Sequence, residues 1–175
     1  MPTTIEQDTT QAAPAAEQKE EQEETRKVAI ICSKGSLDMA YPGLIMANAA
    51  RMMGIEAMLF FTFWGLDIIT EKKTDHLKPG MLGNPSSPMP HSIMGLPGMH
   101  AVAGKMMKKQ MNDLDIPDVR EMLEILDDAG AELYSCQLAM EMFGLEQKDL
   151  IPQVKESLTA MDFWEKAKGA QVVFV

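Results

Sequence analysis

Cysteine is scarce in this chain: the 175 residues contain two, Cys32 and Cys136. Two cysteines are too few for the disulfide framework of a small secreted protein, so a reducing, cytoplasmic compartment is expected. No apolar run approaches the about 18 residues that a transmembrane helix needs, and residues 1–25 lack the hydrophobic segment of a secretory signal. The sequence therefore predicts a protein without a membrane partner.

An excess of positive charge is also missing. Lysine and arginine number 16 against 26 aspartates and glutamates, which gives a net charge of −10. This balance argues against nucleic acids and anionic membrane surfaces as partners. The chain also lacks a G-x-x-x-x-G-K-[ST] loop, and no G-x-G-x-x-G follows its first predicted strand. The motifs of nucleotide-binding folds are therefore absent.

Histidine is rare as well, and the three present, His76, His91 and His100, are separated by 15 and 9 positions. Zinc sites and helix-paired metal sites need closer spacing, so neither a metal nor another cofactor is expected. Methionine, in contrast, is abundant, with 17 residues. Three interpretations stay open: adaptable packing at a partner surface or mobile flap, ordinary core packing, and a Met-rich or Met/His metal-binding module.

Composition divides the chain into a tail and one domain. Residues 1–25 are acidic, polar and without apolar periodicity, which predicts a disordered tail. Residues 26–175 are expected to form an α/β domain. Within it, residues 79–100 are rich in proline, glycine, serine and methionine, which predicts a mobile loop.

Apolar runs and helical periodicity alternate along this domain. Short runs rich in branched and aromatic residues predict strands over 28–32, 56–63, 132–135 and 171–175. Helices are predicted over 37–53, 66–73, 100–112, 119–129, 137–143 and 150–168. Strand–helix–strand repeats of this length favour parallel pairing with right-handed crossovers. The fold class expected is α/β, a doubly wound, mostly parallel sheet of five strands or fewer with helices on both faces.

One cysteine stands where a predicted strand meets a helix. Cys136 follows the strand at 132–135 and opens a helix that stops at Gly144. Backbone N–H groups at a helix start favour an anion, which here would be a thiolate or a persulfide. The alternative is a buried structural cysteine. Cys32, Trp64–Gly65 and Cys136 each end a predicted strand, so we expect them at the same edge of the sheet.

Three blocks of the sequence carry a family resemblance. They are residues 44–50 with Met53–Gly54, residues 60–66, which run Phe-Phe-Thr-Phe-Trp-Gly-Leu, and residues 134–140 with Phe143–Gly144. With them, residues 27–175 resemble the DsrE/DsrF family of sulfur-relay proteins, in particular its soluble DsrE-like subgroup from sulfur-oxidising and related prokaryotes.

The resemblance implies a function. It implies a sulfurtransferase-like carrier that assembles as a homotrimer or hexamer and holds sulfane sulfur on Cys136 as a persulfide. A TusA-type sulfur carrier or a rhodanese would be its partner. Cys32 is then a second sulfur-binding thiol, a partner in a disulfide or trisulfide, or a small apolar strand residue. A cysteine-based redox or peroxide-reducing protein, with Cys32 as resolving thiol, remains the alternative. Lys34 is either a solvated lysine or a source of positive charge at this edge.

Overall fold

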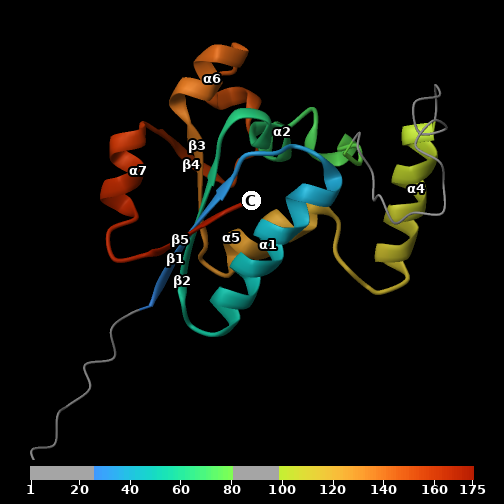
Figure 1. The fold of residues 1–175 in the computed structure, drawn as a ribbon, viewed down its shortest axis with the longest axis horizontal. Helices are drawn as coiled ribbons and strands as arrows, with labels where there is room; N and C mark the ends of the chain where they lie inside the picture. Colours follow the sequence, from blue (N-terminus) through green and yellow to red (C-terminus); the bar gives the residue numbers. More distant parts are fainter. Residues whose placement is uncertain (1–25, 81–98) are drawn as a thin grey trace, which may run out of the picture.

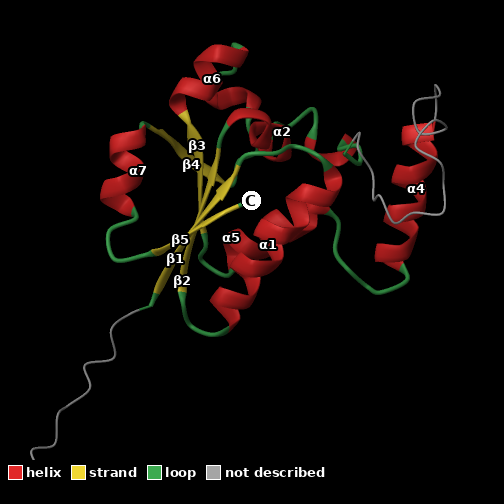
Figure 2. Ribbon diagram, in the orientation of Figure 1, coloured by secondary structure: helices red, strands yellow, loops and turns green. Residues whose placement is uncertain are grey.

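A computed structural model describes residues 26–80 and 99–175. The predicted disordered tail and most of the predicted mobile loop lie outside these residues. The described chain forms a five-stranded sheet in the order β4-β3-β2-β1-β5, and every neighbouring pair is parallel. Helices cover both faces of the sheet (Figures 1 and 2). The predicted fold class is therefore confirmed.

Four of the five strands follow the predicted apolar runs, and β4 does not. The strands are β1 (Lys27–Cys32), β2 (Glu56–Phe61), β3 (Glu132–Cys136), β4 (Val154–Leu158) and β5 (Gln171–Phe174). The sheet separates two clusters of buried side chains, because alternate residues of a strand point to opposite faces. Ile30, Leu59 and Leu133 face one cluster, whereas Met58 and Tyr134 face the other.

The helices lie in the connections between the strands. They are α1 (Leu37–Met52), α2 (Leu66–Ile69), α4 (Met99–Asn112), α5 (Val119–Asp128), α6 (Gln137–Phe143) and α7 (Ala160–Lys166). Helices α1 and α5 pack on the first face, and Phe163 of α7 packs on the second. Within residues 26–80 and 99–175, none of the helices is both long enough and apolar enough to cross a bilayer.

The helix predicted over residues 150–168 is wrong. Its first part is β4, in which Val154 and Leu158 are buried and Lys155 and Glu156 are exposed. The two buried residues stand four positions apart, a spacing that also suits a helix, and the polar residues between them are good helix formers. The strand forms because β3 offers a free edge for pairing, and the capping box at Thr159 then starts α7.

Candidate functional site

Cys136 lies at the predicted junction, as the last residue of β3 and the N-cap of α6. It is partly exposed and packs against both buried clusters. The helix after it ends at Gly144, whose φ of 64° is the left-handed conformation that glycine adopts at low cost. The amides of the first turn of α6 have no acceptor within the helix. The thiol thus lies at the start of α6, at the carboxyl edge of the sheet, and makes no capping hydrogen bond to the helix.

Hydroxyl groups fix the backbone around this thiol. Ser135 is fully buried, and its Oγ lies 2.8 Å from Oγ of Ser157 on β4. Ser157 Oγ also lies 3.0 Å from Sδ of Met140 on α6. These contacts join two strands to the helix that follows Cys136. Because a buried hydroxyl without a partner is costly, the network stabilises this one arrangement of the junction.

Cys32 ends β1 but is only 1% exposed. Helix α1 crosses it closely: a Cβ added to Gly43 would lie 2.8 Å from Cys32 Sγ. Burial raises the pKa of this thiol to about 12. Because the raised pKa belongs to the folded state, the thiol favours folding below about pH 8.5, its unfolded-state pKa, and this contribution is lost as the pH rises toward 12.

The structure does not bring the two cysteines together. Cys32 pairs with Phe61, which pairs with Ser135, so strand β2 lies between the two thiols. Two strand spacings amount to roughly 9.5 Å, whereas a disulfide needs Cα atoms within about 7 Å. Cys136 is the next residue after Ser135 along β3 and contacts both buried clusters, whereas Cys32 lies within the first. A disulfide between them within one chain requires a rearrangement of the sheet, which disfavours the redox alternative.

Two glycines hold together the loops that follow β1 and β2. A Cβ on Gly65 would lie 2.0 Å from the carbonyl oxygen of Cys32, and one on Gly35 would lie 2.1 Å from that of Trp64. The backbones approach more closely than any side chain would allow. The Thr62 amide also donates to the Cys32 carbonyl at 3.0 Å. This explains Gly65, the glycine of the Phe-Thr-Phe-Trp-Gly block: it allows the loop after β2 to pack directly on the loop after β1.

Exposed aromatic and aliphatic side chains surround the carboxyl edge. Phe63 has a φ of 46°, an unfavourable conformation for an aromatic residue, and is 53% exposed. Trp64 beside it and Leu138 on α6 are also exposed. Strand pairing brings the ends of β2 and β3 side by side, so these side chains lie on the same edge as Cys136. No feature of the amino-acid sequence indicates the strained backbone at Phe63.

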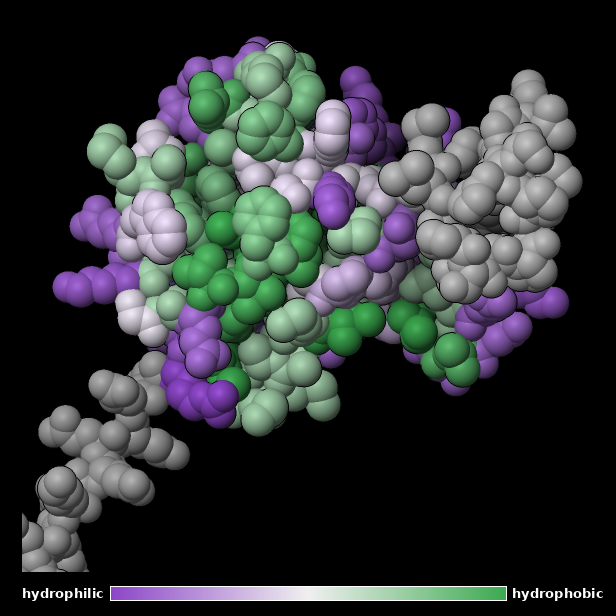
Figure 3. Space-filling model, viewed as in Figure 1, coloured by the Kyte–Doolittle hydropathy of each residue, from purple (hydrophilic) through white to green (hydrophobic). Residues whose placement is uncertain are grey.

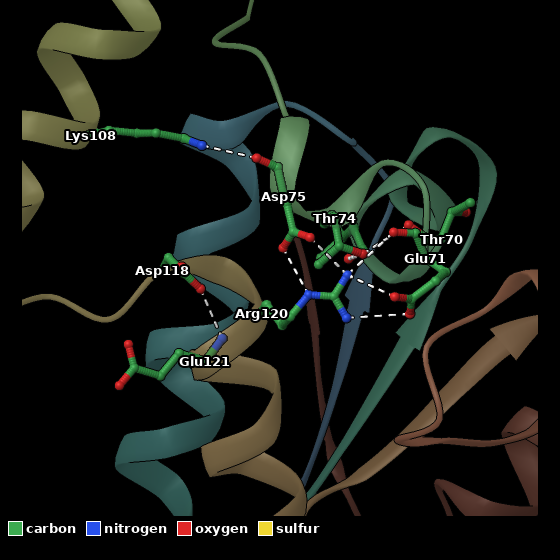
Figure 4. Close-up of polar contacts among 9 residues, drawn as sticks. Thr70, Glu71, Thr74, Asp75, Lys108, Asp118, Arg120 and Glu121 are labelled. Carbon is green, nitrogen blue, oxygen red and sulfur yellow. Dashed lines mark hydrogen bonds and ion pairs between the residues drawn. The ribbon is translucent and has the colours of Figure 1, made fainter.

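An arginine anchors the segment that runs from α2 along this edge (Figure 4). Arg120 on α5 donates to both carboxylate oxygens of Asp75, at 2.8 and 3.0 Å, and forms an ion pair with Glu71 at 3.2 Å. The hydrogen bond from Arg120 lowers the pKa of Asp75. Lys108 of α4 donates to the Asp75 carbonyl at 3.0 Å. Helices α4 and α5 therefore fix residues 71–76 in place.

Among the residues that the structure describes, the remaining candidates do not assemble a metal site. His76 is exposed, and His91 and the side chain of His100 lie outside the described residues. In the part of the chain that the structure describes, no group of three or more histidine, cysteine, aspartate or glutamate side chains could hold a metal ion. Lys34 is exposed and lines a pocket beside the loop that follows β1.

A parallel sheet with a cysteine at a strand-to-helix junction defines a known class. Residues 24–175 match the profile of the DsrE/DsrF/DrsH-like family, and the chain belongs to that family. It is similar to the sulfur carrier protein DsrE2 of Allochromatium vinosum, with 35% identity over 157 residues, covering 85% of this chain and 97% of the relative. It is also 26% identical to the protein YrkE of Bacillus subtilis, over 87% of this chain and 99% of that one.

A solved structure supports the fold. The crystal structure of the ychN protein from E. coli superimposes with a TM-score of 0.52 at 15% identity, over 86% of this chain and 99% of that chain. The family and the sulfur-carrier relative support a role in sulfur relay.

Proposed function

We propose that this protein carries sulfane sulfur as a persulfide on Cys136 and passes it to a partner protein. The observation that carries the proposal is the contrast between the two thiols: Cys136 is partly exposed at the carboxyl edge of the sheet, and Cys32 is buried. The similarity to a sulfur carrier protein supports the same role.

The transfer needs two displacement steps of the same kind. The Cys136 thiolate attacks the outer sulfur of a donor persulfide, a new S–S bond forms, and the donor leaves as its thiolate. The acceptor thiolate then attacks the outer sulfur on Cys136, and Cys136 is released as a thiolate. No electrons are gained or lost overall. A TusA-type sulfur carrier is the proposed acceptor and a rhodanese the proposed donor, in the cytoplasm, where thiols stay reduced.

The test is the mass of the intact protein after exposure to a sulfane-sulfur donor such as polysulfide. The proposal requires a gain of one sulfur atom that depends on Cys136. No mass gain on the wild-type chain contradicts it.

Thiol reactivity offers an independent measurement. Burial raises the pKa of Cys32 to about 12, so this thiol is almost entirely protonated at pH 8. A chromogenic disulfide reagent should therefore titrate one thiol rapidly in the native protein and two after denaturation. The Cys136→Ser variant should show no rapid reaction when folded and one thiol when denatured. Rapid reaction of a thiol in folded Cys136→Ser would contradict this assignment.

We propose further that the chain assembles into a homotrimer or hexamer through an apolar strip formed by β5 and α1. Figure 3 shows apolar side chains gathered over these elements. Val172 and Phe174 on the edge strand β5 are 41% and 69% exposed, and Met46 and Met53 on α1 are 44% and 69% exposed. An exposed apolar edge strand is a strong candidate for burial against another chain.

The Phe174→Glu variant tests this assembly. Burying a carboxylate in an apolar interface is costly, so we expect the dissociation constant of the oligomer to rise at least roughly tenfold. Light scattering coupled to size exclusion measures the mass. Leu114→Glu is the matched control, since Leu114 is 71% exposed and lies outside the strip. A wild-type monomer at micromolar concentration, or equal effects of the two variants, would refute the assembly.

A further inference from the structure

A pocket of about 840 Å³ opens at the carboxyl ends of β1 and β2, and Cys136 does not line it. Its walls are the loop after β1, the first turn of α1, Trp64 after β2, and residues 72–80. We call it the β1–β2 pocket. In open parallel α/β sheets, ligands bind outside the carboxyl ends of the strands. The volume lies in the range of small-molecule sites.

Positive charge is concentrated in this pocket, although the chain as a whole carries a charge of −10. Four lysines line it against two aspartates. Asp67 is paired with Lys73 at 2.6 Å, and Asp38 accepts a hydrogen bond from the Gly80 amide at 2.7 Å. Among residues 26–80 and 99–175, no ion pair involves the other three lysines, which are Lys34, Lys72 and Lys78. The adjoining residues 81–98 contain no aspartate or glutamate.

The start of α1 adds neutral donors to these cations. Ser36 is the N-cap of this 16-residue helix, yet its side chain makes no capping hydrogen bond. Ser36 lines the pocket, so its hydroxyl is a candidate hydrogen-bond donor to a ligand. The positive end of the helix dipole favours an anion at the same point. Lysines, a hydroxyl and a helix start together fit the oxygens of a phosphate group.

Apolar side chains also line the pocket. They are Met39, Leu77 and Pro79 together with Trp64, which is 67% exposed. An inorganic anion would leave these apolar groups uncovered. An exposed indole beside lysines suits a ligand that joins a planar ring to an anionic group.

We propose that the β1–β2 pocket binds a nucleotide, with its phosphates among Lys34, Lys72, Lys78 and the Ser36 hydroxyl and its base against Trp64. The phosphates are held by lysines from separate segments, which is why no phosphate-binding motif marks the site in the sequence. The proposal does not depend on sulfur transfer by Cys136.

The two tryptophans of the chain provide a matched pair of reporters. Trp64 lines the pocket, whereas Trp164 lies on α7 and is similarly exposed, at 63%. In the Trp164→Phe variant, titration with ADP should change the remaining fluorescence saturably. The Trp64→Phe variant should show no change. By isothermal titration calorimetry, Trp64→Ala should weaken ADP binding by roughly 5- to 100-fold, and Trp164→Ala should leave it unaltered.

Charge variants and other ligands complete the test. The pair Lys34→Ala/Lys78→Ala should weaken ADP binding at least roughly tenfold, and the pair Lys148→Ala/Lys168→Ala, of equal charge change, should have less than about a twofold effect. Inorganic phosphate and thiosulfate should bind much more weakly than ADP. No binding of ADP, AMP or ATP at millimolar concentration overturns the proposal, as does binding of phosphate or thiosulfate as tight as that of ADP. Cys136→Ser should bind ADP like the wild type, so this result stands apart from that of the sulfur-loading test.

Discussion

Replacing Cys136 with serine is expected to abolish the gain of one sulfur atom after loading with polysulfide. Serine preserves the size and the N-cap role of the residue, so the fold should persist. Its hydroxyl is not nucleophilic near neutral pH and does not form an S–S bond with the donor. The expected fall in the loaded fraction is from most of the protein to the background level. Intact-mass spectrometry measures it directly, and a reductant should remove the added mass.

The Cys32→Ser variant is the matched control. Cys32 is 1% exposed and lies against α1, so the polysulfide has no route to it in the folded chain. We expect this variant to load as fully as the wild type, although the buried hydroxyl lowers its stability. Full loading of Cys136→Ser, or a loss of loading in folded Cys32→Ser, would show that the carrier thiol has been assigned wrongly.

Replacing Gly65 with alanine should destabilise the fold more than replacing any glycine in open space. The added Cβ would lie 2.0 Å from the Cys32 carbonyl oxygen, and backbone on both sides leaves no flexible group to move. Overpacking of a well-packed site usually lowers the free energy of unfolding by about 1–3 kcal/mol. A clash with backbone should cost about 3 kcal/mol or more, because the backbone cannot move aside as a side chain can. A loss of about 3 kcal/mol would lower the melting temperature by on the order of 10 °C for a domain of this size.

Gly169→Ala separates this clash from ordinary glycine effects. Gly169 has a φ of 77° and nothing within 4 Å of the added Cβ, so only the backbone conformation is strained. The expected cost is about 1 kcal/mol. Thermal and urea unfolding of both variants give the comparison. Equal losses of stability would mean that the loops after β1 and β2 are not locked as described.

The strands and the strand-to-helix junction at Cys136 could be predicted from the sequence, but their mutual orientation could not. Apolar runs are enough to predict β1, β2, β3 and β5. In β1, β2 and β3 the runs reflect burial inside the sheet, whereas β5 is an exposed edge strand. The strand β4 escaped prediction because it depends on pairing with β3. The separation of Cys32 from Cys136 by β2 depends on the order and register of three strands, which no local pattern encodes.

The candidate site was predictable to a similar extent. Cys136 follows from a local pattern, a strand directly before a helix. The strain at Phe63 is a property of its backbone conformation and has no marker in the residue type. The β1–β2 pocket draws its cations from segments that are separated in the chain, such as Lys34 and Lys78. Their proximity arises only because two crossover connections begin at the same edge of the parallel sheet.

The intervening strand β2 has a consequence for the chemistry of oxidation. Many thiol proteins protect or inactivate a reactive cysteine by forming a disulfide with a neighbouring cysteine in the same subunit. Here strand β2 separates the two cysteines, so that route requires a rearrangement of the sheet. Oxidant stress therefore drives Cys136 toward mixed disulfides with other molecules or toward oxyacids, and recovery depends on an external reductant. Under the proposed function, sulfur held on Cys136 would therefore leave only through an encounter with another molecule.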